Sequence, residues 1–152
     1  MSEVFFYHLT RAPLEVTLRL LLEKSLAAGW RVAVRGRSRD MLERLDEQLW
    51  LKPEDSFLPH GLAGGPHDAE QPVLLTTERA APNAPQALIL VEGADMAPEE
   101  AQPLSRAMVL FDGHDAGAVE AARAQWRSLT GAGLKAKYWS EESGKWKMKA
   151  EA

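Results

Sequence analysis

The sequence predicts an α/β protein with a Rossmann-like, mainly parallel sheet and helices on both faces. Two observations lead to this prediction. Segments rich in strand-forming residues alternate along the chain with segments whose leucines recur at helical spacing. Two of the strand segments, residues 87–91 and 107–111, are continuous apolar runs, as expected for strands that are covered on both faces.

The first 29 residues predict a strand followed by a helix. Residues 4–9 are rich in strand formers, and Thr10 and Pro13 suit the cap and the first turn of a helix. Leucines then recur three and four residues apart, and Gly29 supplies a helix stop.

The same order of elements follows a second time. Residues 30–34 predict a second strand, and Ser38 caps a helix that ends near Leu49. Residues 53–71 then form a loop rich in glycine and proline, before a third strand at residues 72–76. A loop of this length inside a compact domain usually has a function or is mobile.

The second half supplies the remaining elements. The apolar runs at 87–91 and 107–111 are strands, residues 115–130 form the last long helix, and residues 135–139 are a candidate closing strand. A chain of 152 residues fits one domain, 1–152. Residues from about 140 to 152 are a candidate for a flexible basic tail.

Composition excludes several classes of protein. The absence of cysteine excludes disulfides, thiolate catalysis and thiolate zinc sites. No apolar run approaches the ~18 residues that cross a bilayer, so no membrane association is expected. The N-terminus lacks a basic flank followed by an apolar stretch, which a secretory signal would have. We therefore expect a cytoplasmic protein.

Charge is unevenly distributed along the chain. The net charge is -4, but residues 123–152 hold seven Lys or Arg and three Glu, which gives +4 and leaves -8 for the first 122 residues. A basic end on an acidic body favours one anionic partner met at one place over nonspecific coating of nucleic acid. A solvated tail would also explain the last lysines.

The sequence lacks the usual phosphate-binding turns. The turn after the first strand, residues 8–13, has no glycine to let a backbone approach a pyrophosphate, and the glycines at 61–65 lack the following Gly-Lys-Ser/Thr. An enzyme of nucleotide or phosphoester chemistry is the alternative that this fold class suggests, and it would need such turns or clustered acids. We expect no cofactor.

Asp95, Asp112, His114 and Asp115 are the best candidates for metal or acid/base chemistry, because strand ends face the usual binding crevice of such a sheet. A structural interpretation suits them better: Asp112 and Gly113 make a turn, and Asp115 caps the next helix. We therefore expect no catalytic residue and no metal site.

The last helix is a candidate binding surface. Arg123 and Arg127 are one helical turn apart and share a face, and each guanidinium is a fork suited to a carboxylate. Trp126, between them, is placed to wall a pocket for an apolar side chain. In the other interpretation Trp126 is core and the arginines are solvated.

The segment after the second helix is another candidate surface. Trp50, Pro53 and Phe57 are large apolar residues at positions where the chain must turn, so they leave the helix's apolar stripe. They predict a docking surface, although such a loop can also pack its own aromatics over the sheet.

This segment also resembles a known family. The residues that carry the resemblance are Leu45-Asp46-Glu47-x-Leu49-Trp50, then Pro53, then Ser56-Phe57-x-Pro59-His60-x-Leu62-Ala63-Gly64. They are similar to the chi subunit of bacterial DNA polymerase III. The resemblance extends over nearly the whole chain, from the N-terminal Phe-Tyr strand to the closing helix, where Arg123, Trp126 and Arg127 match by residue class.

The resemblance implies a noncatalytic accessory subunit of the DNA polymerase III holoenzyme that does not itself bind DNA. In such proteins the closing helix captures the acidic, phenylalanine-terminated C-terminal tail of single-stranded DNA-binding protein. The positions of Trp50, Pro53 and Phe57 belong to a surface shared by the psi subunit, which links chi to the clamp loader, and by a repair helicase. Direct nucleic-acid binding through the C-terminal lysines is a further alternative, which a steep salt dependence with DNA would reveal.

Overall fold

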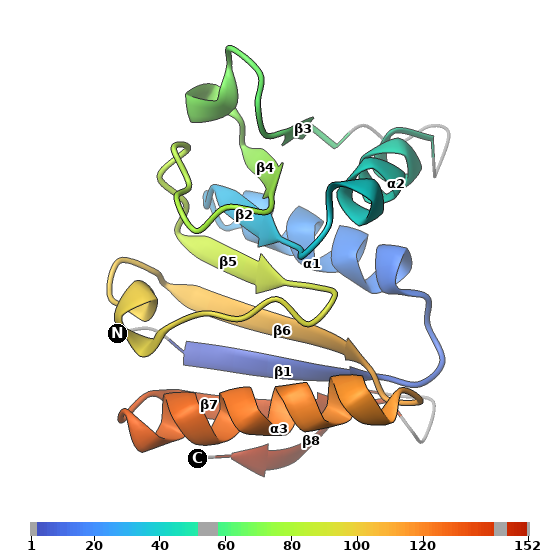
Figure 1. The fold of residues 1–152 in the computed structure, drawn as a ribbon, viewed down its shortest axis with the longest axis vertical. Coiled ribbons are helices and arrows are strands. Elements are labelled where there is room, and N and C mark those ends of the chain that lie inside the picture. The colour runs from blue at the N-terminus through green and yellow to red at the C-terminus, as the bar shows by residue number, and fades with distance from the viewer. Residues whose placement is uncertain (1–2, 52–57, 142–145, 152) are drawn as a thin grey trace.

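The computed structural model describes residues 3–51, 58–141 and 146–151 and confirms the predicted α/β fold. In these residues, eight strands form one sheet in the order β3-β4-β2-β5-β6-β1-β7-β8 (Figure 1). The strands are β1 (Glu3–Leu9), β2 (Val32–Arg35), β3 (Gly61–Leu62), β4 (Val73–Thr76), β5 (Ala87–Leu90), β6 (Arg106–Asp112), β7 (Lys135–Ser140) and β8 (Lys147–Glu151). The helices are α1 (Leu14–Ala27), α2 (Arg39–Leu51) and α3 (Ala116–Gly131), with short 3-10 turns η1 (Asp68–Glu70) and η2 (Pro98–Ala101).

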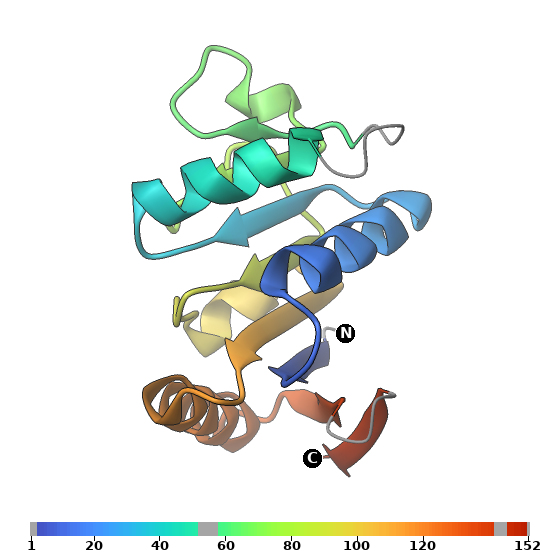
Figure 2. The same ribbon diagram turned by 90° about the vertical axis from the view of Figure 1, so that its right-hand side faces the viewer.

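Strand order decides which face each helix covers. Every pair of neighbouring strands is parallel except β7 and β8, which are antiparallel. The connection from β1 to β2 runs toward one edge of the sheet, and the connection from β6 to β7 runs toward the other. Right-handed crossovers in opposite directions place α1 and α3 on opposite faces, as the two views of the ribbon show (Figures 1 and 2).

The protein therefore has two hydrophobic cores, one on each face of the sheet. On one face the leucines of α1 and α2 pack with Phe5 and Leu9 of β1, and on the other face Ala122 and Leu129 of α3 pack with Phe6. Successive β1 residues point to opposite faces because side chains alternate along a strand. Strand β5 is buried along its whole length and β6 is buried from Ala107 to Phe111, which explains the apolar runs in the sequence.

Three local features differ from the sequence-based expectation. The long loop contains the two-residue strand β3, and the basic C-terminal segment contains β8, a strand that pairs with β7. Thr10 does not cap α1: the N-cap residue is Pro13, without a side-chain cap bond, and Thr10 lies too far before Leu14 to reach the first-turn N–H groups. Ser38 does cap α2, because its hydroxyl accepts the Met41 N–H at 3.3 Å.

The sequence predicted that the chain does not cross a membrane, and the lengths of the helices bear on this prediction. Among the residues that the structure describes, none of the helices combines the length and the apolar character needed to cross a bilayer.

Candidate binding surfaces

The three residues predicted on the last helix lie together around one cavity. Arg123, Trp126 and Arg127 line a space of about 210 Å³ between α3 and the sheet. The other lining residues are apolar or aromatic: Phe6, Phe111, Val119, Ala122 and Tyr138. The cavity therefore joins an apolar interior to a basic rim.

Trp126 is both a packing residue and a wall of this cavity. Its ring meets Phe6 edge to face at a centroid distance of 5.3 Å and Tyr138 at 6.3 Å. The side chain is only partly buried, so one part of the indole supports the core and another faces the cavity. The two interpretations of Trp126, core and pocket wall, thus both describe it.

Both arginines on this rim are exposed. Arg123 forms an exposed ion pair with Glu120 at 3.2 Å, three residues earlier on the helix. Exposed pairs of this kind contribute little free energy, about 0–1 kcal/mol, so a ligand carboxylate can compete for the guanidinium. Arg127 has no ion pair with the described residues. The rim can therefore receive an anion.

Local contacts fix α3 in its place. The Asp115 carboxylate accepts the N–H groups of Gly117 and Ala118 at 2.9 and 3.2 Å, which confirms the predicted cap. Further along the helix, the Gln125 side chain accepts the Met96 N–H at 3.0 Å and ties α3 to the segment before η2. The cavity rim thus rests on a rigid element rather than on a loop.

The second candidate surface lies at the end of α2. This helix continues through Leu51, so Trp50 lies in its last turn rather than after it, as the sequence had suggested. Leu42, Leu45 and Leu49 are buried in the core, whereas Trp50 is 46% exposed because it lies off their stripe. Pro53 and Phe57 lie outside the described residues.

His60 supports Trp50, a role that the sequence did not indicate. Its ring is buried and lies 4.2 Å from the Trp50 ring, centroid to centroid. Its two nitrogens lie 2.7 Å from the Leu58 carbonyl oxygen and 3.1 Å from the Asp46 carbonyl oxygen, so the histidine joins the long loop to α2. A single histidine with no other ligand-type residue at a regular spacing gives no signal in the sequence. Only the fold brings His60 close to Trp50 and Asp46.

The crevice at the carboxyl ends of β1 and β6 is where a Rossmann-type sheet would bind a phosphate. Here one oxygen of the Glu141 carboxylate accepts three backbone N–H groups, from Thr10, Arg11 and Ala12, each at 2.9 Å. Glu141 is 6% exposed. The chain's own carboxylate therefore occupies the backbone donors that a phosphate would use.

These contacts affect the pKa of Glu141. Burial alone would raise the pKa, but the three N–H groups and the nearby charge of Arg11 outweigh it and hold the pKa below its ordinary value. Glu141 is thus an anion at neutral pH, and it competes with any external phosphate for this turn.

The predicted acid/base candidates have structural partners. The Asp112 carboxylate accepts the His114 N–H at 2.8 Å, as expected for a turn, and His114 Nε2 lies 2.9 Å from the Thr10 carbonyl oxygen. Asp95 pairs with Arg79 at 2.7 Å on another part of the molecule. Among the described residues, no three His, Cys, Asp or Glu side chains are grouped to hold a metal ion.

The two candidate surfaces lie on opposite faces of the sheet. The buried leucines of α2 belong to the core on the α1 face, and Ala122 and Leu129 of α3 belong to the other core. Figure 1 also shows α2 near the β3 edge and α3 near the β8 edge. The two candidate surfaces therefore do not overlap.

Comparisons with known proteins agree with the sequence resemblance. Residues 1–137 match the family described as DNA polymerase III chi subunit, HolC. A protein of Rickettsia prowazekii (strain Madrid E), named "Probable DNA polymerase III subunit chi", is 26% identical over 97 residues, which is 64% of this chain. The chain spans about three fifths of that relative's length, 59%. On the family match, the chain belongs to the DNA polymerase III chi subunit family.

Proposed function

We propose that this protein is a noncatalytic accessory subunit of the DNA polymerase III holoenzyme. One face binds the acidic C-terminal tail of single-stranded DNA-binding protein, and the other binds the clamp-loader assembly through psi or another component, or a repair helicase. The observation that carries the proposal is the cavity beside α3, where Arg123, Trp126 and Arg127 meet.

The chemistry of this cavity supports tail binding. An acidic peptide that ends in phenylalanine has two features to be recognised, a set of carboxylates and one apolar ring. The cavity of about 210 Å³ suits a single aromatic side chain against Trp126, and the two exposed guanidiniums on its rim suit the carboxylates.

The exposure of Trp50 supports the proposal that the end of α2 docks a partner protein. A tryptophan that is 46% exposed on a helix end resembles the aromatic anchors that dominate protein interfaces. The buried His60 ring beneath it holds the indole in one orientation, so little side-chain freedom is lost on binding.

The enzyme alternative has less support. An enzyme of nucleotide or phosphoester chemistry would use the turn after β1, where Glu141 already accepts the three N–H groups. Reproducible hydrolysis of nucleotides or phosphodiesters that is lost in Asp112→Ala would contradict the adaptor proposal.

Calorimetry with synthetic peptides tests the tail site. We expect the wild-type protein to bind an acidic, phenylalanine-terminated peptide, and to bind the same peptide without its last residue poorly even at low salt. Affinity should fall as salt rises, because the rim charges are exposed and screened. Equal binding of the two peptides would contradict the proposal, since the cavity would then have no role.

A further inference from the structure

A second and larger cavity lies on the α1 face of the sheet, opposite the α3 cavity. Its volume is about 560 Å³, within the range of small-molecule sites. The helices on this face, α1 and α2, pack mainly against β2, β3, β4 and β6. Tyr7 of β1 and Trp139 of β7, on this face, are only partly covered.

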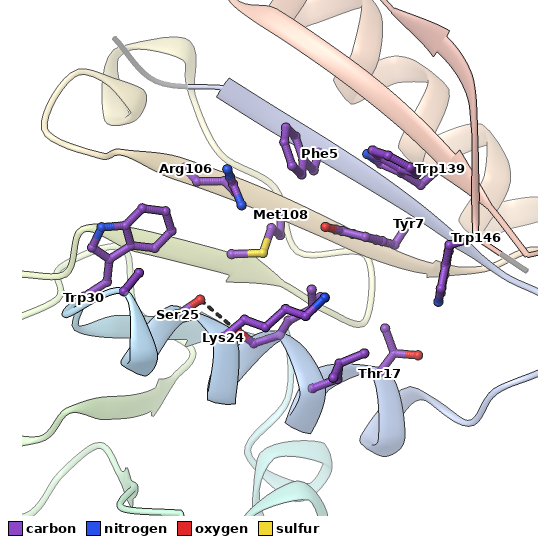
Figure 3. Close-up of a pocket in the computed structure, with 13 residues that line it drawn as sticks. Phe5, Tyr7, Thr17, Lys24, Ser25, Trp30, Arg106, Met108, Trp139 and Trp146 are labelled. Atoms are coloured by element: carbon purple, nitrogen blue, oxygen red, sulfur yellow. Dashed lines mark hydrogen bonds between the residues drawn. The ribbon is translucent and has the colours of Figure 1, made fainter.

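Five of the residues that line the cavity are aromatic. Figure 3 shows Phe5, Tyr7 and Trp139 on the strands, Trp146 at one side and Trp30 at the far end. The rings are connected: Tyr7 meets Trp146 edge to face at 5.4 Å, and Phe5 lies 6.4 Å from Trp139. Such a surface presents ring faces and edges to a flat apolar group.

Arg106 places a positive charge among these rings. Its guanidinium carbon lies 4.2 Å from the Phe5 ring centroid and 5.4 Å from that of Trp30, and Figure 3 shows the side chain between the two rings. It has no ion pair with the described residues, and its Nε is buried without a hydrogen-bond partner among them. A buried donor without an acceptor is unfavourable, so an acceptor that enters the cavity and reaches this guanidinium is bound more tightly.

The other polar groups favour the same sign of ligand charge. Lys24 also lines the cavity, and Trp139 Nε1 is a second buried donor without a partner among the described residues. None of the described lining residues is acidic. Burial raises the pKa of Tyr7 to about 12, against the opposing effect of Arg106, so its hydroxyl stays neutral and does not compensate the guanidinium.

We propose that this cavity binds a small molecule that joins a flat aromatic body to one carboxylate. The carboxylate accepts hydrogen bonds from Arg106, and the ring packs among Phe5, Trp30 and Trp139. A neutral ligand of similar size supplies no negative charge to pair with Arg106. A cationic ligand is repelled by Arg106 and Lys24. The site is independent of the tail site, which lies on the other face.

Two probes that share the naphthalene ring and differ in charge test the charge requirement in the wild-type protein. They are 2-naphthoate and its neutral counterpart 2-naphthalenemethanol. In ¹⁵N-labelled protein, 2-naphthoate should shift the indole N–H signals of Trp30, Trp139 and Trp146 and leave that of Trp50 in place. We expect the naphthoate Kd to be at least about tenfold lower than the Kd of the alcohol. Equal affinities, or no shift of the cavity signals at millimolar naphthoate, would overturn the proposal.

Matched variants then locate the charge. Arg106→Met keeps an apolar side chain of similar length and should remove the preference for the carboxylate, so that both probes bind alike. Arg127→Met, in the α3 cavity, should keep the full preference. If Arg106→Met fails to fold, Lys24→Gln should reduce the preference, and the wild-type comparison decides the proposal without either variant. A preference that persists in folded Arg106→Met would contradict the assigned role of Arg106.

Discussion

At the scale of single residues, the proposed tail site in the α3 cavity has two separate contributions to binding. Trp126 supplies the apolar wall, and Arg123 and Arg127 supply charge at the rim. Because the guanidiniums are exposed while the indole is partly buried, changes at these positions should affect binding in different ways.

Reversal of Arg127 tests the charge contribution. Arg127→Glu replaces an attraction with a repulsion beside the same ligand carboxylates. We expect a loss of ~2 kcal/mol, about thirtyfold in Kd for a micromolar complex, measured by calorimetry at low salt. Arg44→Glu makes the same change on an exposed position of α2 and should bind like wild type. Wild-type affinity in both Arg123→Glu and Arg127→Glu would exclude α3 as the tail site.

Trp126→Ala tests the apolar contribution. The variant removes the cavity wall and leaves both charges, so the peptide should bind more weakly while the salt dependence is retained. The same change also removes the packing on Phe6 and Tyr138, so its free energy of unfolding must be measured beside the affinity. An affinity that stays at the wild-type level in the folded variant would show that the indole does not contact the ligand.

Gly113 makes a close approach that only glycine allows. A Cβ at this position would overlap the His8 ring, which is stacked 5.3 Å from Phe111 and lies 5.8 Å from Tyr138. We expect Gly113→Ala to lower the free energy of unfolding by about 1–3 kcal/mol in urea denaturation. Gly131→Ala, whose Cβ would meet nothing within 4 Å, is the control and should be neutral or slightly stabilising. A neutral Gly113→Ala would mean that His8 moves freely.

At the scale of elements, two adjacent residues in the last turn of α2 differ: Leu49 packs in the core, and Trp50 is the proposed docking residue. Leu49 is 2% exposed and Trp50 is 46% exposed. We expect Leu49→Ala to lower the free energy of unfolding by about 2–5 kcal/mol. Trp50→Ala should change it by no more than about 1 kcal/mol, yet weaken association with psi or the helicase by more than ~2 kcal/mol. Circular dichroism and partner titration measure the two effects, and unfolding of Trp50→Ala would make this residue part of the core.

Glu141 connects the end of β7 to the turn between β1 and α1. Its pKa is lower in the folded protein than in the unfolded chain, so its stabilising contribution is present above the ordinary value of 4.5 and is lost as pH falls through the folded pKa. Glu141→Gln should therefore lose about 1–3 kcal/mol of unfolding free energy at pH 7. The difference from wild type should shrink in denaturation experiments below about pH 4. A difference that is independent of pH would contradict this linkage.

The main elements were predictable because their signals are local. Leucine spacing, the apolar runs at 87–91 and 107–111, and the Asp115 cap each depend on neighbours in the sequence. The contacts that were missed join distant residues: Glu141 with residues 10–12, and His60 with Asp46. Strand β8 was missed for the same reason, since its lysines are polar and only pairing with β7 makes it a strand.

The candidate sites were predictable to different degrees. Helical spacing brings Arg123, Trp126 and Arg127 to one side of α3, and the cavity then depends on Phe6 and Tyr138 from other strands. Spacing alone could not choose between core and pocket for Trp126, because the answer depends on how closely α3 approaches the sheet.

At the scale of the whole molecule, the sheet separates the two surfaces. Helices α2 and α3 lie on opposite faces, and the chain's own Glu141 carboxylate occupies three backbone N–H groups at the crevice of the Rossmann-like sheet. A rigid sheet with one surface on each face suits a subunit that holds two partners at once. We expect the tail peptide to bind equally well to Trp50→Ala and to wild type in calorimetry, and psi or the helicase to bind equally well to Arg127→Glu and to wild type. A strong effect of either change on the other partner would mean that the surfaces are coupled.

The most direct test of this account is a titration of ¹⁵N-labelled protein with the acidic, phenylalanine-terminated peptide, followed through the N–H signals of the five indoles. We expect the Trp126 signal to shift to saturation while the signals of Trp50, Trp30, Trp139 and Trp146 stay in place. The Trp126 shift should be lost in Arg127→Glu at the same peptide concentration. Saturable shifts of Trp30 and Trp139 with a fixed Trp126 signal would place the tail in the α1-face cavity and contradict the account.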